Sequence, residues 1–145
     1  MSGQDGPIAP PRMFDYWHLR RILRIRGHDE DLPFGEWPLV LGSIVAMREP
    51  IWRSVVATAA AHGVIDPLAH WTQENPLQPV DAAMLAELLR PVVEIVEQTR
   101  GVIIAPDIAP DTLPDPQRVR DVLGLLVLLL ELAAAERREA ETWVE

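Results

Sequence analysis

Three residues in the middle of the chain have a spacing that could hold a metal ion. His62, Asp66 and His70 are four residues apart. On one continuous helix their side chains would share a face, and imidazole and carboxylate groups are common zinc ligands. Gly63 and Pro67, however, interrupt any helix that joins them. We therefore expect ordinary histidines at helix ends and in a loop, and no bound metal.

Other patterns of catalytic chemistry are missing from the sequence. Cysteine is absent, which excludes thiolate catalysis and disulfide bonds. Ser43 and Ser54 lie in no Gly-x-Ser-x-Gly motif, and the sequence has no glycine-rich phosphate-binding motif. Glu131 is the one carboxylate embedded among leucines, and we expect it at the exposed edge of a helix or paired with an arginine such as Arg138. We expect no catalytic residue, no cofactor and no enzymatic activity.

The basic residues gather near the start of the chain. All thirteen are arginines, and the net charge is -9. Residues 12–26 hold five arginines and one aspartate, so this segment carries +4 and the rest of the chain carries -13. A solvated helix face is the simplest interpretation. The alternatives are phosphate contact with nucleic acid, which the net acidity disfavours, and docking to an acidic partner or a second copy. We predict docking through Arg12, Arg20, Arg21 and Arg24.

A nearly uninterrupted apolar run, residues 122–135, lies inside what we predict as one long C-terminal helix from Pro116 to about Trp143. Asp115 is placed to cap this helix, and proline suits its first position. Two apolar seams run along it, so the helix should be covered on more than one side. The first seam is Val119, Val122, Leu123, Leu126, Leu129, Leu130 and Ala133, and the second, a candidate contact with another subunit, includes Leu125, Leu128 and Leu132.

Glycine and proline divide the rest of the chain into shorter segments. We predict helices over residues 13–26, 38–48, 51–62 and 81–100, with one or two helical turns near 68–72. Pro91 should kink the helix over 81–100. The buried face of that helix should consist of Leu85, Leu88, Leu89, Val92, Val93 and Val96.

The predicted fold is all-α, a compact bundle of five or six helices around the long apolar C-terminal helix. Residues 1–12 would form an extended N-terminal arm and residues 13–145 a single helical domain. A proline-rich strap, residues 105–115, precedes the last helix. Because proline pushes the residue before it toward an extended conformation, we expect this strap to cross the domain's own surface or to reach a neighbour.

These features favour a non-catalytic assembly or adaptor subunit with a protein partner, in a homo- or hetero-oligomer. One alternative is a helical small-molecule-binding domain with a pocket lined by Trp52, Trp71 and the leucine-rich helix. Another is a nucleic-acid-binding regulator that uses the arginines. The apolar run is shorter than the ~20 residues that cross a bilayer, and residues 1–11 lack a signal-peptide pattern. We expect no membrane span, and a location in the cytoplasm or in a soluble particle.

Overall fold

The structure, a computed structural model, describes residues 19–27 and 44–145. This part of the chain forms three strands, four α-helices and one 3-10 turn. The predicted arm, residues 1–12, lies outside the described residues. In chain order the elements are β1 (Arg20–Ile25), β2 (Ile44–Arg48), α1 (Glu49–Ala61), α2 (Asp66–Ala69), α3 (Pro79–Thr99), η2 (Pro110–Thr112), α4 (Pro116–Glu136) and β3 (Ala140–Val144).

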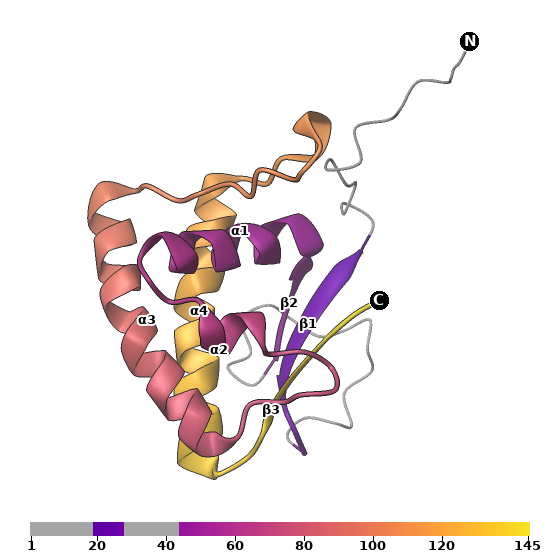
Figure 1. The fold of residues 1–145 in the computed structure, drawn as a ribbon, viewed down its shortest axis with the longest axis vertical. Helices are drawn as coiled ribbons and strands as arrows, with labels where there is room; N and C mark the ends of the chain where they lie inside the picture. Colours follow the sequence, from indigo (N-terminus) through magenta and orange to yellow (C-terminus); the bar gives the residue numbers. More distant parts are fainter. Residues whose placement is uncertain (1–18, 28–43) are drawn as a thin grey trace.

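The strands form one antiparallel sheet in the order β2-β1-β3. At the centre of the sheet, Leu23 of β1 lies opposite Val45 of β2 and Thr142 of β3. The helices gather on one side of the sheet (Figure 1). Since side chains alternate along a strand, Leu23 and Ile25 both point toward these helices, and both are fully buried in the core.

The helical layer supplies most of the core. α1 and α4 pack against the sheet, and α3 packs along α4 at the outer side of the molecule (Figure 1). Burial of the first seam of α4 is confirmed, because none of its seven residues exposes more than 2% of its surface. The seam meets Trp52 and Val55 from α1 and Leu85 and Leu89 from α3 in a single apolar cluster.

The prediction of an all-α bundle was wrong. Residues 20–25 and 44–48, which we assigned to helices over 13–26 and 38–48, form β1 and β2. Residues 13–18 and 38–43 lie outside the described part of the chain. Short apolar segments do not distinguish strand from helix by periodicity alone. Here the β-branched Ile22, Ile25, Ile44 and Val45 pack well on a pleated surface, and pairing between strands supplies the backbone hydrogen bonds.

The C-terminal helix begins as predicted but ends seven residues early. The carboxylate of Asp115 accepts a hydrogen bond from the backbone nitrogen of Gln117 at 2.9 Å, which caps the first turn. α4 then stops at Glu136, because Arg137 adopts a left-handed conformation with φ 57°. The predicted continuation to Trp143 was wrong, since those residues turn back and pair with β1 as β3.

The remaining helices are close to their predicted positions. α1 begins two residues before the predicted start at residue 51, α2 is one turn where one or two were expected, and α3 begins at Pro79 rather than 81. α3 runs through Pro91 as one helix of 21 residues. The four helices found in the described part of the chain, together with the sheet, replace the predicted five or six.

The strap lies across the domain's own surface, next to α1. Two fully buried hydroxyl groups of α1 hold the backbone at and just before its start: Ser54 Oγ accepts from the nitrogen of Ala105 at 3.2 Å, and Thr58 Oγ1 accepts from the nitrogen of Ile103 at 2.9 Å. Ile108, inside the strap, is buried. The hydroxyl groups of α1 thus accept hydrogen bonds from backbone nitrogens of a segment that belongs to no helix or sheet.

Leu123 and Leu128 test which face of α4 the core uses. Leu123 is fully buried, whereas Leu128 is 55% exposed. Replacing Leu123 with alanine should lower the free energy of unfolding by about 2–5 kcal/mol, because it leaves a cavity. The same replacement at Leu128 should change it by less than about 1 kcal/mol. Urea denaturation of both variants checks this, and equal losses would contradict the assigned orientation of α4.

Candidate functional site

The arginines predicted to form one docking surface lie on both faces of the sheet. Alternation along β1 places Arg21 on the side that faces the helices, with Leu23, and places Arg20 and Arg24 on the opposite side. The single arginine face was wrong, because it applied a helical period of 3.6 to a segment whose period is two. Arg12 lies outside the described residues.

Carboxylates near the end of the chain neutralise two arginines of the β1 region. Arg24 donates to Glu141 at 2.8 Å, and Arg26 donates to Glu139 at 2.6 Å. Glu139 also accepts a hydrogen bond from Gln78, and the hydrogen bonds from Gln78 and Arg26 lower the pKa of its carboxyl group. These arginines serve ion pairs within the fold. The observation behind the nucleic-acid hypothesis, a basic helix face, is therefore not present in the described residues.

A largely buried ion pair joins the sheet to α1. Nε and Nη2 of Arg21 donate to the two carboxylate oxygens of Glu49 at 2.9 and 2.8 Å, and Nη1 donates to Thr142 Oγ1 at 3.2 Å. The two charged side chains are 15% and 7% exposed. A bidentate pair has a strict geometry, while desolvation offsets much of its Coulomb attraction. The pair therefore determines how α1 sits on the sheet more than it adds to stability.

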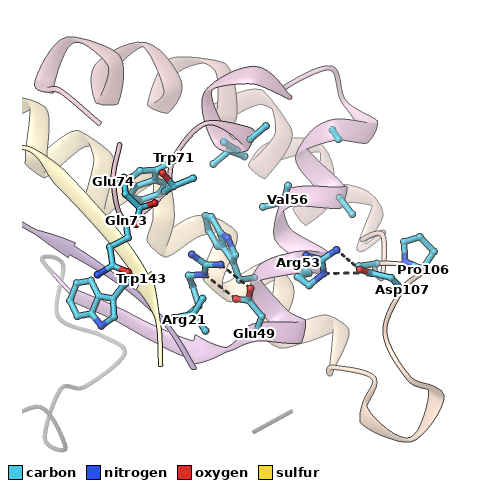
Figure 2. Close-up of a pocket in the computed structure, with 18 residues that line it drawn as sticks. Arg21, Glu49, Arg53, Val56, Trp71, Gln73, Glu74, Pro106, Asp107 and Trp143 are labelled. Atoms are coloured by element: carbon cyan, nitrogen blue, oxygen red, sulfur yellow. Dashed lines mark hydrogen bonds and ion pairs between the residues drawn. The ribbon is translucent and has the colours of Figure 1, made fainter. Parts of the chain in front are cut away.

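Beside this ion pair lies a cleft of about 640 Å³ (Figure 2). Its walls come from α1, the α2 region with residues 71–74, β3 and the strap. Trp52 and Trp71 both line it, and their rings meet edge to face at 5.8 Å and 78°. The leucine-rich helix predicted for this pocket does not line it. Clefts of roughly 300–1,000 Å³ are typical of small-molecule sites.

Hydrogen bonds and ion pairs fix the walls of the cleft. The indole nitrogen of Trp71 donates to the carbonyl oxygen of Ala140 at 2.8 Å, which ties the α2 region to β3. On the opposite side Arg53 of α1 forms an ion pair with Asp107 of the strap (Figure 2). These two contacts join the four wall segments in pairs, the α2 region with β3 and α1 with the strap, so the walls of the cleft are part of the folded framework.

The predicted second seam of α4 is only partly open. Leu125 and Leu132 are half-buried and pack against the core, so of the three predicted interaction leucines only Leu128 is mainly exposed. Leu125 and Leu128 line one side of a groove of about 940 Å³ between α3 and α4. α4 therefore offers a single large apolar side chain rather than a continuous contact face.

A longer apolar surface runs along α3. Val80, Met84, Leu88 and Ile95 are 78%, 51%, 46% and 42% exposed, and Pro91 is exposed as well. We call these five residues the α3 stripe. The prediction that Leu88 belongs to the buried face was wrong. These five residues are spaced by four, four, three and four positions, which is also a helical spacing. From the sequence we assigned only the core-facing set of apolar residues and placed Leu88 in it.

The histidines and acidic residues named from the sequence are not gathered at a metal site. Within residues 19–27 and 44–145, no three His, Asp or Glu side chains are placed to hold a metal ion together. His70 Nδ1 lies 2.9 Å from the carbonyl oxygen of Asp66, within its own turn. Glu131 pairs with an arginine, as expected, but the partner is Arg90 of α3 at 2.6 Å and not Arg138. In the same part of the chain, no helix has the length and apolarity that crossing a membrane requires.

Comparisons of the chain with protein-family models, with curated proteins and with solved structures find no match. Two features of the described residues are candidates for function: the cleft beside Arg21 and Glu49, and the α3 stripe.

Replacing Glu49 with alanine tests the ion pair. The variant leaves the guanidinium of Arg21 largely buried without a carboxylate, and the loss of unfolding free energy should be about 3–5 kcal/mol. Replacing both partners, Arg21→Met with Glu49→Leu, should recover most of that loss, because no uncompensated charge remains. Chemical denaturation of the single and double variants measures both effects. A double variant no more stable than Glu49→Ala would contradict this account.

Proposed function

We propose that this protein is a non-catalytic interaction subunit whose α3 helix binds a basic amphipathic helix of a different protein. The observation that supports the proposal is the α3 stripe. Single exposed apolar residues are common on soluble proteins and need no explanation. Five of them aligned along one helix form a continuous surface of the kind that marks a protein contact.

The stripe has the dimensions of a helix-binding surface. Val80 and Ile95 are fifteen residues apart, which corresponds to ~22 Å along the helix axis. At about 100° per residue, the five positions fall within about 80° of the helix circumference. Leu85 and Leu89 point into the core from the other side. α3 thus has two apolar faces, one packed on α4 and one exposed, and the exposed face suits an amphipathic partner helix.

The flanks of the stripe favour a partner of opposite charge. Glu87 and Glu94 are exposed along one flank, and Asp81 is exposed on the other. Arg90, the basic residue of α3, is engaged by Glu131 of α4. In paired helices the residues beside the apolar seam select partners by charge. An acidic border therefore favours a helix whose own apolar seam is bordered by lysine or arginine.

The same charges disfavour a second copy of this chain as the occupant. Two α3 helices meeting stripe to stripe would bring Glu87 and Glu94 of both copies to the border of the contact. Like charges in such positions are destabilising, and the net charge of -9 adds repulsion between whole molecules. The proposal is therefore a heteromeric contact.

A pair of synthetic helical peptides tests the charge of the partner. Both carry the same leucine seam, one bordered by lysines and the other by glutamates. Fluorescence anisotropy at physiological salt should show binding of the lysine peptide and none of the glutamate peptide. Equal binding of the two would contradict the charge argument, and no binding of either would overturn the proposal.

Leu88→Glu separates docking from general electrostatic attraction. The variant adds negative charge, so nonspecific attraction to the lysine peptide would increase. Binding on the α3 stripe would instead weaken by about ten-fold or more, because burial of a leucine is worth roughly 1.5–3 kcal/mol. Ala83→Glu is the matched control, since Ala83 is exposed on the same helix but lies off the stripe. It should bind at least as well as the unchanged protein. Undiminished binding by Leu88→Glu would count against the stripe.

Light scattering of the unliganded protein tests the alternative occupant. We expect a monomer at every salt concentration, because the stripe and its acidic flanks do not complement themselves. A dimer that Leu88→Glu dissociates would identify a second copy as the occupant and would overturn the heteromeric proposal.

A further inference from the structure

The cleft beside Arg21 and Glu49 lies apart from the α3 stripe and shares no residue with it. We propose that this cleft binds an uncharged aromatic small molecule that carries a hydrogen-bond acceptor, such as the carbonyl oxygen of an amide. The proposal rests on the apolar lining, the pairing of the charged groups and the polar groups that remain without a partner.

The apolar part of the cleft suits a flat ring. One face of α1 presents Val56, Ala57 and Ala60 to the cleft. Two of these three side chains are single methyl groups, so they occupy little of its space. Trp52 and Trp71 line the cleft with only 5% and 3% of their surface exposed, and their edge-to-face contact holds each ring in position. A planar aromatic ligand would lie against the small exposed part of these rings, and neither ring would have to rotate.

Four of the five charged side chains of the described residues that line the cleft are paired with one another. Arg21 is paired with Glu49, and Arg53 is paired with Asp107, so two cations and two anions are already engaged with one another (Figure 2). Glu74, at the rim, adds one exposed negative charge. An anionic ligand would meet three carboxylates, and a cationic ligand would compete with arginines already bound to theirs. An uncharged ligand avoids both penalties.

Not all N–H groups of the Arg21 guanidinium are engaged in hydrogen bonds within the described part of the chain. A guanidinium has five N–H groups, and three of them donate to Glu49 and Thr142. The other two have no acceptor in the described part of the chain, although the side chain is only 15% exposed and lines the cleft. Donors withdrawn from most of the solvent require an acceptor. A carbonyl oxygen at the end of an aromatic ring would supply one without adding charge.

The cleft is built before a ligand arrives. Trp71 is bonded to the backbone of Ala140, and the strap is held to α1 by Arg53 and by buried hydroxyl groups. Binding would therefore cost little conformational entropy, so more of the contact energy would appear as affinity. The strap acts as a fixed wall of this site.

Three compounds of nearly equal shape test the proposal: benzamide, benzoate and benzamidine. They share one ring and differ only in the charge and hydrogen-bonding of its substituent. Each is titrated to ~10 mM, a range suited to fragments of this size, while the indole N–H resonances of Trp52 and Trp71 are followed by NMR. Benzamide should shift both resonances in a saturable manner and more strongly than either ion. No saturable shift with benzamide, or a stronger response to benzoate or benzamidine, would overturn the proposal.

Filling the cleft provides the matched control. Ala60 lines it, whereas the neighbouring Ala61 is exposed and does not. Ala60→Phe should abolish the benzamide response, and Ala61→Phe should leave it unchanged. If Ala60→Phe fails to fold, Ala57→Leu on the same wall takes its place. A benzamide response that survives in the filled variant would place the ligand elsewhere and overturn the assignment.

Discussion

β1 is the middle strand of the sheet, and the rest of the structure depends on its having a partner on each side. Arg20 and Glu145 exchange backbone hydrogen bonds of 3.0 Å at one end of the β1 and β3 pair, and the nitrogen of Arg26 donates to Glu139 at the other. Leu77 then pairs with Ala140 on the outer side of β3, with reciprocal bonds of 2.9 Å. These bonds bring β1, β3 and the segment that follows α2 together, and the cleft forms where β3 and the α2 region meet α1.

The ion pairs of the arginines explain why the two candidate sites differ in charge. Arg21, Arg24 and Arg26 enter ion pairs with carboxylates of α1 and the C-terminal strand region. The positive segment of the sequence is thus neutralised inside the fold, while the exposed side of α3 keeps its acidic residues. One consequence is a cleft whose two arginines are both paired with carboxylates. The other is an apolar stripe with an acidic border, and the two surfaces therefore select different kinds of ligand.

Prediction from sequence succeeded where a strong local pattern and a cap coincided. The start of α4 at Pro116, its buried seam and the extent of α1 followed from helical spacing and from Asp115. Prediction failed at β1, β2 and β3. Each strand has only five or six residues, too few for the spacing of apolar residues to distinguish strand from helix, and its backbone hydrogen bonds are made with distant segments. Trp52 and Trp71 were identified as pocket residues, but the pairing of Arg21 with Glu49 required knowledge that Arg21 lies on a strand. The α3 stripe was present as spacing, but only the exposed fractions show which of the two stripes faces the core.

The central place of β1 also governs the order in which a nascent chain can fold. β1 gains its first neighbour once residue 48 has been made, but its second only after residue 144. At about 5–20 residues per second, roughly 5–20 s separate the two events during synthesis. Over that interval one edge of β1 has no strand beside it, and Trp71 has no Ala140 to bond. The emerging chain therefore presents an unpaired strand edge and incompletely covered apolar surface, which are the features that chaperones recognise at the ribosome.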